Sequence, residues 1–491
     1  MQPFPLSPVP TPLIFERSRP GRGGTRVPRP ITAQRATDVL PAAALRKAPP
    51  RLPEVPEFEV MRHYVELSLK NHHVDRALYP LGSCTMKYNP KVNEDMARLP
   101  GFAALHPFAP DAACQGALRL VHTLGEWLKD VSGMDAITLQ PAAGAQGEMT
   151  GIFLIAAYHR ARSDAARKTV IIPDSAHGTN PATAALAGFV VKAIKSDARG
   201  QMDLAALQAA LGPDTAAVML TNPNTVGRFE TEVVEIARLV HGAGALLYMD
   251  GANMNALMGV VRPGDSGVDA MHFNLHKTFS TPHGGGGPGA GPVAVKRHLE
   301  PFLPVPLVVK DGDRYRREWD RPRSIGKLHG YFGNFGMMVR AYTYIAMLGR
   351  EGIRETAQAA VLNANYLAAR IEGAYPLPFG RGMHECVATG TPFKERHGVK
   401  TLDIAKRLLD YGFHAPTVYF PLIVPEALMI EPTETATKDE LDRFADTMLQ
   451  IAKEAETEPE LVTGAPRLTP VSRFDEAAAA RNPDVRFAFG A

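Results

Sequence analysis

Seven short apolar runs between residues 136 and 295 constrain the fold of this chain more than any other feature of its sequence. Most end in a polar or Gly-rich turn and lead into a helical pattern. The runs are Ala136–Leu139, Thr169–Ile172, Phe189–Ile194, Ala216–Leu220, Ala245–Met249 and two weaker ones, Ala270–Phe273 and Val293–Val295. Apolar strands alternating with helices are typical of a mostly parallel sheet covered on both faces. We therefore expect an α/β large domain whose ligands lie at the carboxyl ends of the strands.

The sequence predicts four segments in this chain of 491 residues. An extended N-terminal arm (1–57) is rich in Pro and Arg, and a helical N-terminal segment (58–115) follows it. The large domain covers 116–340, and a smaller C-terminal α+β domain with a tail covers 341–491. In that last part, helical stretches flank possible strands at His384–Ala388 and Leu428–Ile430. Because the arm contains Leu13, Ile14 and Phe15, we expect it to pack across a partner subunit.

Composition excludes several classes of protein. A net charge of +3 gives no reason to expect nucleic acid or a membrane surface as a partner. No apolar run approaches the roughly 18 residues that a membrane helix needs. Three cysteines without C-x-x-C spacing form no disulfide framework, and His384-Glu385-Cys386 lacks the second histidine of a zinc motif, so we expect no metal. Early prolines argue against a transit helix, and a cytoplasmic, reducing location is expected.

Three strand ends carry polar residues of low individual specificity. After the first run, the small residues Ala143, Gly144 and Ala145 with Gln146 open a helix, where backbone N–H groups suit a phosphate; a plain helix start explains them equally well. After the second run, His177 is placed to stack on a flat ring, although a turn histidine is the commoner case. After the fourth run, Asn222 precedes a proline, as in many turns.

Two charged residues make the pattern more specific. Asp250 follows a buried apolar run, where a carboxylate needs a cationic partner or else caps the next helix. Lys277 follows another short run and precedes the glycine-rich stretch His283–Gly289. Pyridoxal phosphate requires an amine, a carboxylate for its ring nitrogen and a phosphate site, usually with a ring-stacking group. The order of these residues is that of fold-type-I pyridoxal phosphate enzymes, so we expect this fold and this cofactor.

Longer sequence motifs resemble those of one particular family of pyridoxal phosphate enzymes. The segments Asn274–Phe279 and Pro282–Gly289 resemble the pyridoxal-lysine signature of glycine dehydrogenase (decarboxylating), the P-protein of the glycine cleavage system. Four further segments also match that family: Pro80–Lys87, Gln140–Glu148, Asp174–Pro181 and Glu431–Glu434. Many P-proteins have about twice this length. The chain therefore resembles subunit 2 of two-chain P-proteins, which also fits Leu13–Arg22.

The resemblance implies an activity and a set of roles. Lys277 would hold the cofactor as a Schiff base, Asp250 would keep the pyridine nitrogen protonated, and His177 would stack on the ring. Asn222 would bond the ring oxygen, and residues 143–146 would face the phosphate. Thr179 and His276 are further cofactor-binding candidates. Glycine would lose CO2, and its aminomethyl group would pass to the lipoyl arm of the H-protein.

The partners implied are glycine, the lipoylated H-protein and a homologous subunit 1, in an α2β2 heterotetramer. We further expect Gly285 and Gly286 to leave room for the lipoyl arm.

Other readings stay open. An aminotransferase or amino-acid decarboxylase of the same fold would need no lipoyl partner, and Arg381 is available to bind a substrate carboxylate. A non-catalytic scaffolding subunit would lack Lys277. Ser83, Thr85 and His329 are candidates for holding the glycine carboxylate. The roles of Lys327 and of the segment Gly330–Gly336 are open.

Overall fold

The chain divides into two compact units in the computed structural model, which describes residues 11–24, 28, 31–283, 289–328 and 330–489. One unit combines Met1–His73 with Ala465–Ala491, and the other is Val74–Gly464. Within the described part, no helix has the length and apolarity needed to cross a membrane. The predicted boundaries near residues 57, 115 and 340 stay predictions.

The first unit joins the two ends of the chain. Its helices are α1 (Ile14–Arg17), α2 (Ala36–Val39), η1 (Ala42–Ala44), α3 (Glu57–Leu69) and α16 (Glu476–Arg481). Phe15 stacks on Phe487 at 4.8 Å between ring centroids, and Arg17 pairs with Glu66 at 2.7 Å. The apolar residue that led us to expect packing of the arm thus has a partner within its own chain. Packing of the arm across another subunit stays a prediction.

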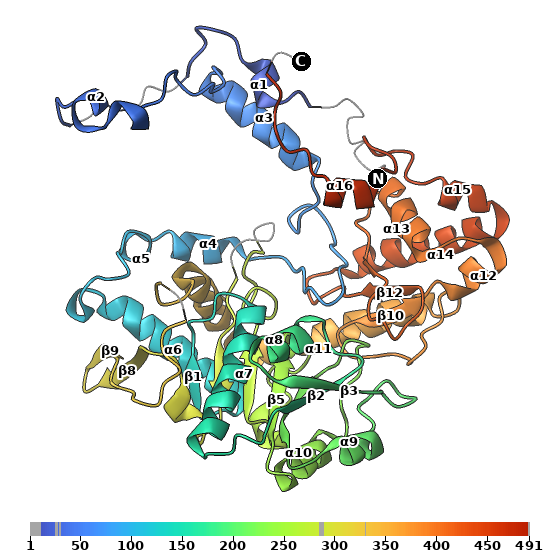
Figure 1. Cartoon of the computed structure of the whole chain (residues 1–491). Helices are drawn as coiled ribbons and strands as arrows, with labels where there is room; N and C mark the ends of the chain where they lie inside the picture. Colours follow the sequence, from blue (N-terminus) through green and yellow to red (C-terminus); the bar gives the residue numbers. More distant parts are fainter. Residues whose placement is uncertain (1–10, 25–27, 29–30, 284–288, 329, 490–491) are drawn as a thin grey trace. The chain divides into compact units, whose positions relative to one another are not determined.

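A seven-stranded sheet forms the centre of the second unit (Figure 1), and its strands match the seven predicted runs. Their order is β1-β7-β6-β5-β4-β2-β3, and only β7 runs antiparallel to its neighbours. The strands are β1 (Ala136–Thr138), β2 (Thr169–Pro173), β3 (Val190–Ile194), β4 (Thr215–Thr221), β5 (Leu246–Gly251), β6 (Ala270–Phe273) and β7 (Val293–Val295). Six strands therefore direct their carboxyl ends to one edge.

Alternate side chains of the central strands enter two different cores, because successive residues of a strand point to opposite faces. Leu247 and Met249 of β5 pack with one set of helices, while Leu246 and Tyr248 pack with another. The first face is covered by α6 (Gln115–Ser132), α9 (Leu204–Ala210), α10 (Val233–Gly242) and α11 (Phe335–Ile371), and the second by α7 (Gly144–Ala161) and α8 (Thr179–Leu186). Apart from the largely exposed edge strand β3, the sheet is thus buried on both faces, as predicted.

Further elements complete the unit. Before α6 lie α4 (Lys91–Ala97), α5 (Pro100–Ala103) and η2 (Asp111–Ala113), and between β5 and α11 lie η3 (Met254–Ala256), η4 (Pro263–Ser266), η5 (Glu300–Phe302) and the hairpin β8 (Leu307–Asp311) and β9 (Arg314–Glu318). The long α11 is interrupted at Gly349, whose φ is 62°. The two helical stretches that the sequence pattern predicts there, Tyr342–Leu348 and Ala357–Ile371, lie on either side of this kink.

The C-terminal part of the second unit has its own sheet and core. Its strands β10 (Cys386–Thr389), β12 (Ala427–Ile430) and β11 (Thr417–Val418) pair antiparallel in that order. The helices α12 (Thr391–His397), α13 (Thr401–Asp410), α14 (Lys438–Thr457) and α15 (Pro459–Thr463) accompany them. Residues from α11, α13 and α14 bury this sheet in an apolar cluster. Both strands predicted in this region are present.

Close packing of α7 on the sheet generates a first prediction. A Cβ atom at Gly151 would lie 2.2 Å from Cε2 of the fully buried Tyr248. We expect Gly151→Ala to lower the free energy of unfolding by about 1–3 kcal/mol, because an overpacked core must shift. Gly116→Ala is the control, since nothing lies within 4 Å of its Cβ position in α6. In urea denaturation, Gly116→Ala should have a free energy of unfolding equal to or higher than that of the unaltered protein. Equal free energies of unfolding for the two variants would contradict the prediction.

Candidate functional site

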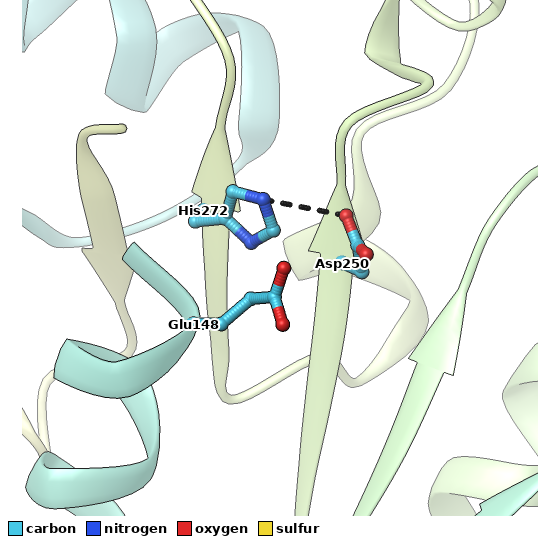
Figure 2. A group of neighbouring side chains, drawn as sticks. All are labelled: Glu148, Asp250 and His272. Carbon is cyan, nitrogen blue, oxygen red and sulfur yellow. Dashed lines mark ion pairs between the residues drawn. The ribbon is translucent and has the colours of Figure 1, made fainter. Parts of the chain in front are cut away.

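Asp250, at the end of β5, is the centre of a buried polar group beside the sheet (Figure 2). Parallel pairing of β5 and β6 places His272 directly opposite it, and His272 Nε2 lies 3.3 Å from Asp250 Oδ1. The same oxygen accepts a hydrogen bond from the backbone N–H of Ala252 at 2.9 Å. The other oxygen accepts one from Asn180 Nδ2 at 3.3 Å. Both carboxylate oxygens are thereby held in place.

Tyr248 fixes the histidine that holds Asp250. Its hydroxyl lies 2.7 Å from His272 Nδ1, and both side chains are buried. Burial lowers the pKa of His272, which favours the neutral ring. A neutral ring that receives the tyrosine hydroxyl at Nδ1 carries its proton at Nε2, where it donates to Asp250. Tyr248, His272 and Asn180 are site residues that sequence reasoning missed.

Glu148 of α7 directs a second carboxylate toward Asp250 and His272 (Figure 2). One ligand atom from each of the three residues lies within 4.8 Å of the others. Burial, and then the negative charge of Asp250, raise the pKa of Glu148 to about 8. Glu148 therefore keeps its proton at neutral pH, which avoids two adjacent buried charges.

The predicted phosphate turn is an open helix end. Helix α7 begins at Gly144 with Ala143 as N-cap residue, and no side chain caps it. Ala143 and Ala145 are exposed, and the Gln146 side chain accepts a hydrogen bond from the backbone of Ala142 at 2.5 Å. A Cβ atom at Gly144 would lie 2.3 Å from Asn274 Oδ1, so any larger residue would force the Asn274 side chain to move. Uncapped N–H groups at the start of an 18-residue helix suit an anion.

Lys277 extends to the segment Pro80–Lys87, which we call the entry segment. Its Nζ atom donates to the carbonyl oxygen of Ser83 at 2.8 Å. The backbone N–H of Ser83 donates in turn to Glu385 Oε2 at 3.0 Å. The lysine amine thus has a neutral backbone partner. The entry segment, which the sequence only flagged as a family motif, lies beside it.

The other predicted cofactor residues lie at the same edge of the sheet. His177 is exposed after β2, and its Nδ1 atom is 2.9 Å from Thr179 Oγ1. Asn222 is buried after β4, where its Oδ1 atom accepts a hydrogen bond from the backbone of Glu230 at 3.1 Å. Burial lowers the pKa of His276, next to Lys277, to about 3. Gly285, Gly286 and His329 lie outside the described residues.

A second buried acidic group lies behind the entry segment. Glu385 and Glu431 are fully buried, with His384 beside them. Glu431 accepts hydrogen bonds from Thr85 Oγ1 at 2.5 Å and Asn255 Nδ2 at 3.1 Å. Burial raises the pKa of Glu431 to about 7 and raises that of Glu385 well above its usual range. The pair therefore retains at least one proton near neutrality.

Two open candidates are engaged elsewhere. Arg381 is exposed and forms an ion pair with Glu372, with Nε 3.0 Å from Oε2. Lys327 donates to the carbonyl oxygen of Gly330 at 2.7 Å and lies over the ring of Phe332 at 4.8 Å. Among the described residues, neither cation forms a hydrogen bond or ion pair with the group around Asp250, so we assign neither a role in binding.

A buried ion pair anchors the end of the entry segment. Lys87 Nζ lies 2.7 Å from Glu434 Oε1, with side-chain exposures of only 1% and 8%. The lysine also donates to the carbonyl oxygen of Thr278 at 2.7 Å and contacts the Tyr344 hydroxyl at 3.1 Å. Thr278 directly follows Lys277. The pair therefore connects the entry segment, the lysine loop and the C-terminal sheet region.

Comparison with known proteins decides the family. The chain is 57% identical to a probable glycine dehydrogenase (decarboxylating) subunit 2 of Halalkalibacterium halodurans, over 97% of this chain and 98% of the relative. It is 56% identical to the protein of the same description from Chloroherpeton thalassium, over 97% of each chain. The chain belongs to this subunit 2 family.

Family models and solved structures agree with that membership. Residues 356–464 match the model of the glycine dehydrogenase C-terminal domain, and residues 146–307 match that of class-V aminotransferases. A crystal structure of glycine decarboxylase (P-protein) of the glycine cleavage system, in inhibitor-bound form, superposes with a TM-score of 0.72 at 21% identity. It covers 84% of this chain and 93% of that one. A Burkholderia pseudomallei sphingosine-1-phosphate lyase superposes with a TM-score of 0.60 at 15% identity, over 84% of this chain and 93% of that one. The fold is that of fold-type-I pyridoxal phosphate enzymes.

Proteins of this family use pyridoxal phosphate, and the residues present fit it. The uncapped start of α7 suits the phosphate, and the Asp250 carboxylate suits a protonated ring nitrogen. Lys277 supplies an amine that is bonded to a carbonyl oxygen and not to a carboxylate. Glu148 Oε2 is buried and has no hydrogen-bond partner among the described residues. This oxygen can therefore still form a hydrogen bond to a group bound beside Asp250.

The buried pair at the entry segment generates a second prediction. We expect Lys87→Met to lower the free energy of unfolding by about 3–5 kcal/mol, because Glu434 would remain buried without its cation. Lys91→Met is the matched control: its partner is Asp75, and the two side chains are 58% and 42% exposed. An exposed pair contributes at most about 1 kcal/mol. Chemical denaturation of both variants tests this, and similar losses would refute it.

Proposed function

We propose that this chain is the pyridoxal-phosphate-bearing subunit of a glycine cleavage P-protein, located in the cytoplasm. It decarboxylates glycine and passes the aminomethyl group to the lipoyl arm of the H-protein. The observation that carries the proposal is 57% identity to a subunit 2 relative over nearly the full length of both chains. A homologous subunit 1 is the proposed partner, in an α2β2 assembly.

The roles that we assign rest on the site geometry. The cofactor, when bound to Lys277, supplies an electron sink for the pair left behind when CO2 departs. Asp250 keeps the ring nitrogen protonated, and its carboxylate is held for this by His272, Asn180 and Ala252. The first turn of α7, residues 143–146, holds the phosphate.

Stacking and hydrogen bonds orient the ring. His177 would stack on the ring, and Thr179 contacts its Nδ1 atom. Asn222 orients the ring oxygen, and His276 lines the lysine loop. Each of these roles is a proposal.

The charged residues near Lys277 bear on how a substrate carboxylate would be held. Glu385 and Glu431 lie behind the entry segment, and Lys277 interacts electrostatically with both. Arg381, the cation considered for a substrate carboxylate, is paired with Glu372 at the surface. Without that cation, a substrate carboxylate would lack an arginine partner that stabilises its retention. Ser83 and Thr85 remain the candidates for contacting it.

An aminotransferase or a free-amine decarboxylase is the alternative from the same fold. The two readings differ in their need for a lipoyl partner. We expect exchange of labelled bicarbonate into glycine to rise strongly when lipoylated H-protein and subunit 1 are added. Amino-group transfer to a keto acid, with no response to the H-protein, would support the alternative instead.

The amine of Lys277 generates a third prediction. We expect Lys277→Ala to abolish both the visible absorbance of the bound cofactor and glycine–bicarbonate exchange, because no other residue supplies the covalent link. Circular dichroism should remain that of the unaltered protein. Lys310→Ala, at an exposed lysine of β8, is the control and should retain both signals. Persistence of the visible band in Lys277→Ala would overturn the assignment.

A further inference from the structure

The hydroxyl of Thr179 connects the buried carboxyl of Glu148 to the exposed imidazole of His177. Thr179 Oγ1 lies 2.8 Å from Glu148 Oε1 and 2.9 Å from His177 Nδ1. Glu148 is buried and His177 is exposed, so the chain runs from the interior to the surface. A hydroxyl between an acid and an imidazole can donate to either one while accepting from the other.

We propose that Glu148, Thr179 and His177 form a proton relay that couples the carboxyl buried beside Asp250 to the Nδ1 atom of the histidine over the cofactor ring. The position of His177 over that ring rests on the proposed function. The relay itself is a property of this chain, present without cofactor. Glu148 and Thr179 are thus positioning residues that act through His177.

The relay has two proton arrangements. In the first, the Glu148 carboxyl donates to Thr179 Oγ1, and the threonine hydroxyl donates to His177 Nδ1. In the second, His177 Nδ1–H donates to Thr179, whose hydroxyl donates to an ionised Glu148. Passing from the first to the second breaks one O–H bond at Glu148 and forms one N–H bond at His177. Thr179 gives its hydroxyl proton to His177 and takes the proton of Glu148 in its place. One proton moves, and no electrons are transferred.

The surroundings favour the first arrangement in the cofactor-free protein. Glu148 faces the charge of Asp250 on β5 and the neutral His272 on β6, and Lys277 is the nearby cation. The backbone N–H of Thr179 also points to His177 Nδ1 at 3.3 Å, which requires a lone pair there.

A positive pyridine nitrogen beside Asp250 reverses this preference. The positive nitrogen would offset the negative charge of Asp250, which opposes ionisation of Glu148. Ionisation of Glu148, and with it the second arrangement, would then be favoured. His177 would then carry a proton on Nδ1 when the cofactor is in place. The relay would thereby make the stacked ring more electron-withdrawing in the loaded protein.

The test follows His177 in the cofactor-free full-length protein by NMR of 13Cε1-labelled histidine between pH 5 and 10. The His177 resonance is assigned by its loss in His177→Asn. Burial and Asp250 raise the pKa of Glu148 to about 8. We therefore expect the resonance to show an inflection near pH 8, in addition to the titration of the imidazole itself. No inflection there would overturn the relay.

Variants separate a relay from a simple effect of charge. Glu148→Gln should abolish the inflection. Thr179→Val keeps the Glu148 charge but removes the hydroxyl, so the inflection should lose more than half its amplitude. Thr179→Ser should retain it, as should the control Thr183→Val, one turn along α8. Full amplitude in Thr179→Val would show that the charge acts through space and would refute the relay. Because no cofactor or turnover is involved, failure here is distinct from failure of the proposed function.

Discussion

The pairing of β5 with β6 is the constraint on which the site depends. Parallel register sets Asp250 opposite His272, and the residue two positions before Asp250 on the same strand, Tyr248, then reaches the far nitrogen of that ring. A shift of one residue would turn His272 to the opposite face of the sheet and deprive the buried carboxylate of one of its three donors. An isolated carboxylate inside a protein is costly, so the native register and the integrity of this group stabilise each other. The hydrogen-bond ladder of the sheet therefore determines the direction in which the Asp250 carboxylate faces.

The entry segment has a comparable role on the other side of Lys277. It accepts the lysine amine through the Ser83 carbonyl and is held from behind by Glu385, Glu431 and Glu434. These contacts span more than 300 residues of sequence, between the start of the second unit and its C-terminal sheet region. Because Lys87 also bonds the carbonyl oxygen of Thr278, the buried ion pair reaches the residue next to the reactive lysine. Tertiary contacts of the C-terminal part thereby position a loop of the central sheet.

Sequence reasoning recovered the fold because the strands are mostly apolar runs, and it placed polar residues at the strand ends because parallel sheets gather them at one edge. It named Asp250, His177 and Thr179, which lie after such runs. It missed Tyr248 and His272, since both lie inside the runs and look like core residues with the wrong polarity. The available signal was a histidine in a four-residue strand otherwise made of Ala, Met and Phe. The proximity of the acids at 385 and 431 could not be predicted from the sequence, because only the folded chain brings the two distant strands together. Periodicity did predict two helical stretches within α11, and the non-helical backbone of Gly349 separates them.

Two pairs of buried acids lie near a single lysine, and this arrangement has a consequence for charge. Glu148, Glu385 and Glu431 each interact electrostatically with Lys277, and Asp250 lies beside Glu148. If all four acids were ionised, the interior would hold four negative charges against one amine, which the low dielectric would not tolerate. Raised pKa values for Glu148, Glu385 and Glu431 remove that excess by retaining protons. A ligand that brings a positive charge to Asp250 adds one unit of charge to this buried group. Ionisation of Glu148 supplies the matching negative charge, so the net charge of the group does not change. Protons stored in the acids therefore allow the same buried group to remain stable with and without its cofactor.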